Sequence, residues 1–486
     1  MNALLGERRG AIWAAGCVLL MIVLFLPAWI NRQPVLYPDS VGYFHAGYAA
    51  AKQVKHEADI HVRHRPAATA PVLTRQQSEG VATARSVYYG AIFVAGYVLG
   101  GVWALALGQV LLTLACLVLA GRRAIALAPL PLMGALCAIA LLTGLNIFAV
   151  TAMPDVFAGL MLLSMVMLLV HGRELPRWEN AFWLAVVLLA CLFHKAHLAI
   201  LALTLAASLL LPFVRREGLR AFLLLAGAGL VALGGHYAVD LAVRQATGKW
   251  PVSTPFALAR MVGDGTAEQY LRDVCPTRHF ATCAYVSRMP MTENDFLWSH
   301  DPDVGVMGVA PAETRAAIAG EANAIVLGTL TAYPLEQVAA TTRNVMTQLG
   351  DVGVREYRLL PTDTIATIPM LRWALDRYAA SGIAQGWFPL DEISILMRAV
   401  YFAALIGIGT LLWRRRGGPV LASAEVRLTL LLLAGIVANA IISGAVAGVF
   451  DRYQGRIVWL APFGFAVLLA MMLKEKRPEN NALKSR

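Results

Sequence analysis

Long apolar runs recur along the 486-residue chain and are separated by shorter polar segments. An apolar run of about 20 residues is long enough to cross a bilayer as a helix, and residues 11–30 form the first such run. Further spans are expected over residues 102–120, 124–145, 156–170, 221–241, 394–412, 426–448 and 457–473, with two short spans within 181–214. The pattern therefore predicts an all-α polytopic membrane protein with about ten transmembrane helices.

One apolar stretch, residues 85–120, is too long for a single span. Gly100-Gly101 divides it, so we expect residues 86–99 to form a helix at the membrane interface and the span proper to follow. The aromatic residues that would anchor this interfacial helix are Tyr88, Tyr89 and Tyr97.

Composition and charge agree with a membrane protein. Hydrophobic residues make up 58% of the chain, against roughly 45–50% in soluble proteins. The net charge is +11, but basic pairs such as Arg122-Arg123 and Arg215-Arg216 stand at the ends of spans. Membrane topology thus explains much of the excess, and no nucleic-acid partner is expected. The positive-inside rule predicts cytoplasmic N and C termini for a multi-pass protein of the plasma (bacterial inner) membrane.

The spans divide the chain into three modules. Residues 1–242 form an N-terminal transmembrane module with outer loops at 31–84 and 146–155, and residues 393–486 form a C-terminal three-helix module. Residues 243–392 lie between them and are expected to form a mainly helical extracytoplasmic domain. Prolines mark three helices in this domain, which begin near Pro311, Pro334 (ending at Gly350) and Pro369.

Cys275 and Cys283 lie close together within this polar region, whereas the other four cysteines lie in apolar runs. In an oxidising compartment the two can close a short disulfide loop. The sequence contains no Cys-x-x-Cys or Cys/His spacing typical of zinc ligands, so no zinc site is predicted.

The ionisable residues at span boundaries fall on the predicted outer side. Ionisable groups at membrane depth are costly, and by default they mark a site or a pathway. Because the ionisable residues of this chain gather on one predicted side, their positions favour a pocket at the outer interface over a path through the full membrane depth. They are Asp39, Arg85, Asp155, His194, Lys195, His197, Arg452 and Arg456.

The two acidic residues of this set each allow two interpretations. Asp39 follows the first span, where a partly buried carboxylate is suited to accept a proton from a hydroxyl or amine as a general base. It could equally cap a helix that begins near Ser40 or Val41, and the two roles are compatible. Asp155 could cap the next span, or face Asp39 and orient an acceptor or hold a divalent cation.

His194 and His197 are three residues apart and would share one face of a helix. Together with Lys195 they could bind a phosphate or a sugar hydroxyl. The alternative is that the histidines are satisfied core residues and that the lysine extends to the interface.

Arg452, Tyr453 and Arg456 precede the last span and could form an anion site. The alternative is an ordinary basic loop, although basic outer loops run against the usual topological bias. The His/Arg cluster at residues 56–65 is expected to be a solvated part of the first outer loop, with substrate gating as the alternative.

In their order and sidedness, these segments resemble GT-C-type membrane glycosyltransferases, most closely the bacterial branch related to protein mannosyltransferases and aminoarabinose transferases. A first span followed by an outer loop that opens with an acidic motif is the arrangement of that family. The matching segments cover the N-terminal half and the extreme C-terminus. They are residues 37–43, 85–90 leading to a span with Gln109, 153–157, 194–197, and Arg452-Tyr453 before a span with Pro462.

The resemblance implies a polyprenyl-phosphate-linked sugar as donor, taken from the outer leaflet, and a lipid, glycan or protein acceptor. It implies inverting transfer on the outer face, with Asp39 as the base and Asp155 helping to place the acceptor. Arg85, Lys195, Arg452 or Arg456 would neutralise the donor phosphate. The full set expected to bind substrate is Tyr37, Arg85, Tyr88, His194, Lys195, His197, Arg452, Tyr453 and Arg456.

Three other functions remain open at this point. A glycan ligase or polymerase would rely on arginine and histidine more than on Asp39. A transporter or flippase for a lipid-linked anionic substrate needs charged or broken helices at mid-membrane, and these are scarce in the spans. A non-catalytic envelope-assembly protein would use residues 243–392 as a docking surface.

Overall fold

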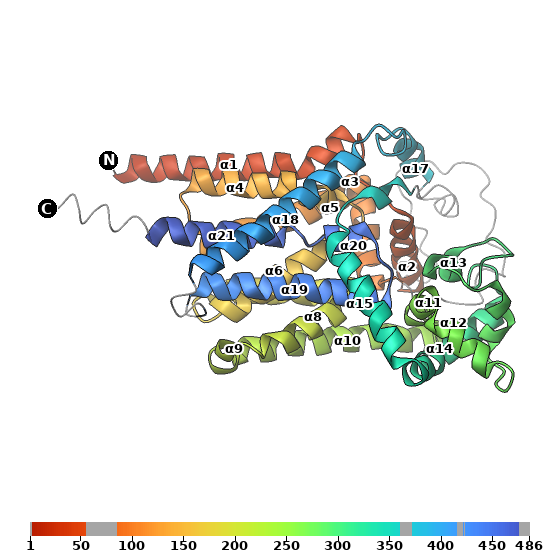
Figure 1. Ribbon diagram of the computed structural model, residues 1–486. Coiled ribbons are helices and arrows are strands. Elements are labelled where there is room, and N and C mark those ends of the chain that lie inside the picture. The colour runs from red at the N-terminus through yellow and green to blue at the C-terminus, as the bar shows by residue number, and fades with distance from the viewer. Residues whose placement is uncertain (1, 55–84, 360–371, 416–420, 422, 476–486) are drawn as a thin grey trace.

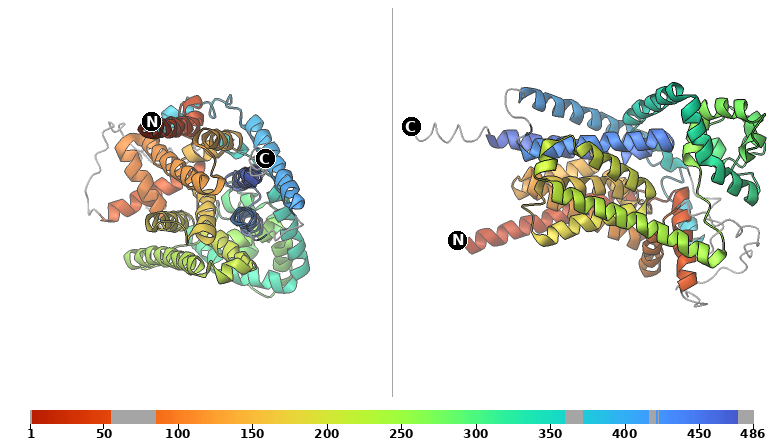
Figure 2. Two further views of the ribbon diagram at one scale, coloured as in Figure 1. Left: turned by 90° about the vertical axis from the view of Figure 1, so that its left-hand side faces the viewer. Right: turned by 90° about the horizontal axis from the view of Figure 1, so that it is seen from below.

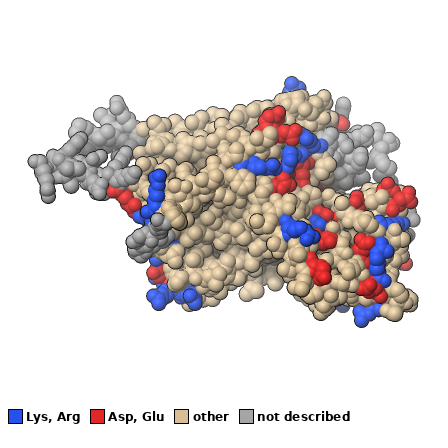
Figure 3. Space-filling view, viewed as in Figure 1, with Lys and Arg blue, Asp and Glu red and all other residues tan. Residues whose placement is uncertain are grey.

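The structure is a computed structural model that describes residues 2–54, 85–359, 372–415, 421 and 423–475. Within these residues it contains helices and no β-strand. Figure 1 shows long helices side by side, with both termini at one end and a group of shorter helices at the other. Figure 2 (left) views the long helices end-on, and Figure 3 shows charged side chains near both ends of the molecule with a wide uncharged zone between them.

Six helical segments of the described chain are long and apolar enough to cross a membrane, so the chain is a helical membrane protein, as predicted. Four of them lie in α1 (Asn2–Ile30), α10 (Leu219–Thr247), α18 (Leu390–Arg414) and α19 (Ala424–Val446). The other two are Val87–Ile125, which contains α3 (Val87–Ala120), and Asp451–Glu475, which contains α21 (Leu460–Glu475).

Shorter helices occupy the remaining predicted spans. They are α4 (Pro129–Leu142), α6 (Val156–His171), α7 (Arg177–Phe193) and α8 (Lys195–Ser208). Each predicted span therefore coincides with a helix, whereas the count of ten and the side on which the termini lie stay predictions. Short elements connect the long helices: η2 (Gly121–Ile125), α5 (Leu145–Val150), α9 (Pro212–Arg216) and α20 (Asp451–Gly455).

The expected division of the long apolar run is present as a kink in α3. Gly101 has φ 69° and ψ −160°, a backbone conformation that residues with a Cβ atom rarely adopt. The run over 181–214 is divided as well, since α7 and α8 meet at the extended residue His194.

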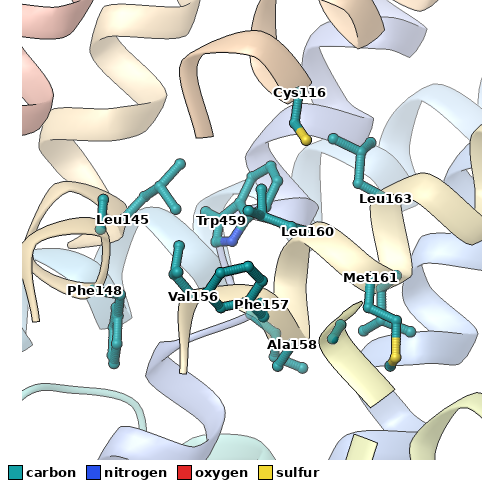
Figure 4. Close-up of a cluster of buried hydrophobic side chains, with 14 of the residues drawn as sticks. Cys116, Leu145, Phe148, Val156, Phe157, Ala158, Leu160, Met161, Leu163 and Trp459 are labelled. Carbon is teal, nitrogen blue, oxygen red and sulfur yellow. The ribbon is translucent and has the colours of Figure 1, made fainter. Parts of the chain in front are cut away.

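Helix α6 lies at the centre of the bundle. Every residue from Val156 to Leu169 is buried, which is typical of a helix that is apolar on all sides and surrounded by other helices. Figure 4 shows Phe157, Leu160 and Trp459 packed together in this core. Because Asp155 comes directly before α6, it is attached to one of the most enclosed segments of the molecule.

The segment after α1 and the segment after α5 are joined by backbone hydrogen bonds. Val35 and Thr151 form an isolated parallel bridge, in which the Val35 N–H donates to Val150 O at 3.1 Å and the Ala152 N–H donates to Val35 O at 2.9 Å. From α3, Gln109 Nε2 donates to Thr151 O at 2.7 Å. These contacts place the segment before Asp39 beside the segment before Asp155.

Helix α2 (Pro38–Val54) crosses α3 with the two backbones in direct contact. A Cβ atom added to Gly90 would lie 2.3 Å from Tyr43 O and 2.6 Å from Gly47 N, distances that real Cβ atoms do not show. Only glycine allows this approach. The crossing sets the position of α2 relative to Arg85, which stands just before α3.

The predicted extracytoplasmic region, residues 243–392, divides its packing between two cores. Leu258, Phe296 and Ile325 belong to a core of its own, whereas Tyr357 and Tyr378 are buried in the core of the membrane bundle. Its helices are α11 (Phe256–Gly263), α12 (Thr266–Val274), η3 (Ala281–Arg288), α13 (Glu293–Trp298), α14 (Ala312–Ala332), α15 (Pro334–Gly350), η4 (Arg355–Arg358) and α17 (Arg372–Ala379).

Several local predictions for this region are confirmed. Pro311 precedes α14, and α15 runs from Pro334 to Gly350. Cys275 and Cys283 are joined by a disulfide. Pro369 and the His/Arg cluster at 56–65 lie outside the described residues.

We expect Gly90→Ala to destabilise the protein, because the added methyl group pushes α2 away from α3. Overpacking of this kind costs about 1–3 kcal/mol, and a lower thermal midpoint of the purified protein in detergent would measure it. Gly108→Ala is the matched control, since it lies in the same helix and its added Cβ meets nothing within 4 Å. Equal midpoints for the two variants would contradict the proposed close crossing.

Candidate functional site

Asp39 lies in the first turn of α2, which begins at Pro38 rather than at Ser40 or Val41. Proline suits the first position of a helix because it has no N–H to leave unpaired, so the helix starts earlier than expected. The Asp39 carboxylate accepts a hydrogen bond from Arg85 Nη2 and lies 3.9 Å from Arg452 Nη2. Its side chain is 25% exposed, so one charged group of the site remains open to solvent or substrate.

Asp155 is the buried counterpart of Asp39. It stands at the N-cap position of α6 but makes no capping hydrogen bond with its side chain. Instead its two oxygens accept from Arg452 Nη1 at 2.8 Å and from Arg456 Nη1 at 3.0 Å. All three side chains are only 3% exposed. The interpretation of residues 451–456 as a solvated basic loop is therefore wrong, because these arginines are enclosed with a carboxylate.

Glu356 is a third carboxylate of the site, and the sequence analysis missed it. Its Oε2 accepts from Arg452 Nε at 3.1 Å, whereas its buried Oε1 has no hydrogen-bond partner. Arg355 holds η4 in place by donating from Nε to Asp451 at 2.8 Å. Burial raises the pKa of Glu356 from 4.5 to about 7, and Arg452 opposes this shift only in part. The only sequence signal was the dense charge of residues 355–358.

Aromatic rings enclose the Arg452 guanidinium. Its Cζ lies 4.3 Å from the centre of the Tyr37 ring and 5.1 Å from that of Tyr453, and Arg456 lies 5.3 Å from the Tyr453 ring. Cation–π contacts of this kind stabilise a charge without neutralising it. Tyr37 and Tyr453 therefore belong to the same site as the ion pairs.

The His/Lys segment lies beside this centre with mainly structural contacts. His194 caps α8, since its Nδ1 accepts from the Ala196 N–H at 3.1 Å, and His197 Nδ1 is 2.8 Å from Ala190 O. The two rings lie 5.1 Å apart although His194 itself is outside the helix. His197 Nε2 is buried without a hydrogen-bond partner. The satisfied-core interpretation thus accounts for one ring nitrogen of each histidine.

Tyr88 and Lys195 line a small pocket together with Arg85. Tyr88 Oη donates to Gly235 O at 2.8 Å, and half-exposed Lys195 is 3.7 Å from Asp240. The pocket also includes His236. Because Arg85 contacts Asp39 and also lines this pocket, it connects the pocket to the ion-pair centre.

The arrangement is best described as a network of three carboxylates and three guanidinium groups with Arg452 at its centre. Asp39, Asp155 and Glu356 each approach Arg452, while Arg85 also pairs with Asp39 and Arg456 also pairs with Asp155. Such a centre can hold an anion and move a proton at the same place. No group of three or more potential metal ligands occurs among the described residues, and Arg452 stands between the two aspartates.

We expect Asp155→Asn to destabilise the protein strongly, because it leaves Arg452 and Arg456 buried without their shared negative partner. Removing one member of a buried ion pair costs about 3–5 kcal/mol, measurable as a large fall in the thermal midpoint in detergent. Asp391→Asn, which removes an exposed partner of Arg358, should change the midpoint little. Similar small shifts for both variants would argue against the buried ion pairs.

We also expect stability to fall as the pH rises from about 5 to about 8, since the folded protein holds a proton on Glu356 that the unfolded chain has released. The slope from one such group is at most about 1.4 kcal/mol per pH unit. Glu356→Gln should flatten the slope in a series of unfolding measurements, whereas Glu313→Gln, an exposed substitution in the first turn of α14, should keep it. An unchanged slope in the Glu356 variant would refute the assignment.

Comparison of the chain with protein-family models, with curated proteins and with solved structures finds no match.

Proposed function

We propose that this protein is a membrane glycosyltransferase that moves a sugar from a polyprenyl-phosphate donor to a lipid, glycan or protein acceptor. The observation that carries the proposal is the position of Asp39, a partly exposed carboxylate between the guanidinium groups of Arg85 and Arg452. Glycosyl transfer from a phosphate requires a base for the acceptor hydroxyl and positive charge for the leaving phosphate. Asp39 could supply the first, and Arg85 and Arg452 the second.

The acceptor hydroxyl loses its proton to an Asp39 carboxylate oxygen as its own oxygen forms a bond to the anomeric carbon of the sugar. The bond between that carbon and the phosphate oxygen breaks, and the electron pair leaves with the polyprenyl phosphate. Arg85 and Arg452 stabilise the negative charge that grows on the phosphate. Attack opposite the leaving group inverts the anomeric configuration.

Asp155 takes a positioning role in this proposal. It is enclosed by two arginines, so no substrate hydroxyl can reach it without displacing them. One Asp155 oxygen binds Arg452 and so keeps that guanidinium near Asp39. The other Asp155 oxygen binds Arg456, which helps to fix the carboxylate. The expectation that Asp155 places the acceptor directly is replaced by an action through Arg452.

The membrane setting of the proposal is an outer-face site in a plasma (bacterial inner) membrane, with about ten spans and cytoplasmic termini. In support, the candidate site lies at the end of the bundle opposite to both termini (Figure 1). The uncharged zone between the ends matches the part of the surface that lipid would cover (Figure 3).

We expect Asp39→Asn to lower turnover about 10²–10⁴-fold, because amide replacement removes the proton acceptor. The assay measures release of polyprenyl phosphate by the purified protein from a panel of polyprenyl-phosphate-linked sugars. Asp303→Asn, an exposed substitution in the turn after α13, should leave turnover unchanged. The variant must keep the wild-type thermal midpoint for the comparison.

Turnover by Asp39→Asn within a few-fold of wild type would exclude Asp39 as the base. Absence of turnover by the wild-type protein with every donor would reject the transferase proposal in favour of a ligase, a transporter or a docking protein.

A further inference from the structure

Helix α15 carries an apolar stripe on its outward face. Leu335, Val338 and Met346 are 79%, 62% and 65% exposed. They follow one another at helical spacing, with Ala339 and Thr342 completing the stripe, so five neighbouring positions carry no charge. Large apolar side chains gathered in this way on one face mark an interaction surface.

The opposite face of α15 is tied to the outer end of α19 and to the candidate site. Asn344 Nδ2 donates to Gly444 O at 3.3 Å, near the end of α19. Gln348 holds Phe450 from both sides, since its Nε2 donates to Phe450 O at 2.8 Å and its Oε1 accepts from the Phe450 N–H at 3.1 Å. The stripe therefore points away from the bundle at the level where a span ends.

The surface beside the stripe belongs to membrane spans. Val437 and Val446 of α19 are exposed, as are Ile395 and Ile406 of α18. In helices that cross a membrane, exposed apolar side chains of this kind contact lipid. Because α15 crosses the end of α19, its stripe lies next to the exposed apolar surface of that span (Figure 1).

The neighbouring helix extends the same feature. Leu327 and Leu330, near the end of α14, are exposed just before the tight connection to α15 at Tyr333. The exposed charges of α15, Glu336 and Arg343, lie about a quarter turn from the stripe, because each residue advances about 100° around a helix. An apolar face flanked by charge is typical of a helix that lies in the membrane interface.

We propose that the α14–α15 hairpin rests on the outer leaflet, with Leu327, Leu330, Leu335, Val338 and Met346 in contact with lipid acyl chains. The occupant of this face is the same bilayer that covers α18 and α19. The inference does not depend on the enzymatic activity proposed above.

The consequence concerns the depth of the candidate site. Glu356 follows the end of α15 by only a few residues. Gln348 of α15 also binds Phe450, which directly precedes Asp451. A hairpin held by lipid would therefore keep Arg452 at a set level relative to the lipid headgroups.

The test places a nitroxide spin label on Met346→Cys or Val338→Cys in the full chain reconstituted in phospholipid nanodiscs. Collision rates with molecular oxygen, which concentrates in lipid, and with a neutral nickel chelate, which stays in water, are then compared. Val437→Cys on α19 is the lipid-facing reference and Asp303→Cys the water-facing one. Labelled wild-type protein gives the background from its native cysteines.

The expected result is an oxygen-to-nickel ratio at both α15 positions that approaches the ratio at Val437 and exceeds that at Asp303. A ratio like that of Asp303 would overturn the proposal, because it would place the stripe in water. Low collision rates with both reagents would overturn it as well, because a second copy of the chain or another protein would then cover the stripe.

Discussion

The buried guanidinium of Arg452 is the constraint on which the candidate site depends. A charge taken out of water is tolerated only when oppositely charged partners surround it, and these partners come from three distant parts of the chain. Asp39 follows the first span, Asp155 precedes α6, and Glu356 lies in the region between α15 and α18. Satisfying one cation therefore requires the segment after α1, the segment after α5 and the region between α15 and α18 to meet at one point, which no single segment could specify alone.

Backbone contacts fix the positions of the charged groups in this centre. The bridge between Val35 and Thr151 places the two acidic segments side by side, and the glycine contact of α2 with α3 sets the distance from Asp39 to Arg85. Asp155 is attached to the enclosed helix α6 and is the least exposed of the three carboxylates. Asp39, on a helix at the rim, retains exposure. The same network thus contains an enclosed carboxylate that holds two cations and a second one that is partly exposed.

The sequence could predict the membrane spans and the charged residues at their ends, because both are visible in the pattern of apolar positions. Every predicted span coincides with a helix, and Asp39, Asp155, Arg452 and Arg456 were recognisable because charge at the end of an apolar run is costly. Glu356 carried no such signal, since it lies in a region without long apolar runs, where charged residues are ordinary. The contact of Gly47 with Gly90 could not be predicted either. A close crossing depends on which helices pair, and the hydropathy pattern does not indicate the pairing.

The difference between the two aspartates bears on which could handle a proton. Asp155 has both oxygens bound to arginines within 3.0 Å, so taking up a proton would break contacts that hold two buried cations. Asp39 keeps one strong partner, Arg85, while Arg452 stands 3.9 Å away and is engaged more closely elsewhere. Arg452 keeps Asp155 and Glu356 as partners when Asp39 turns to a substrate, so Asp39 can exchange a contact without leaving a buried cation unpaired. Asp155 has no such freedom, because Arg456 has no other carboxylate partner among the described residues.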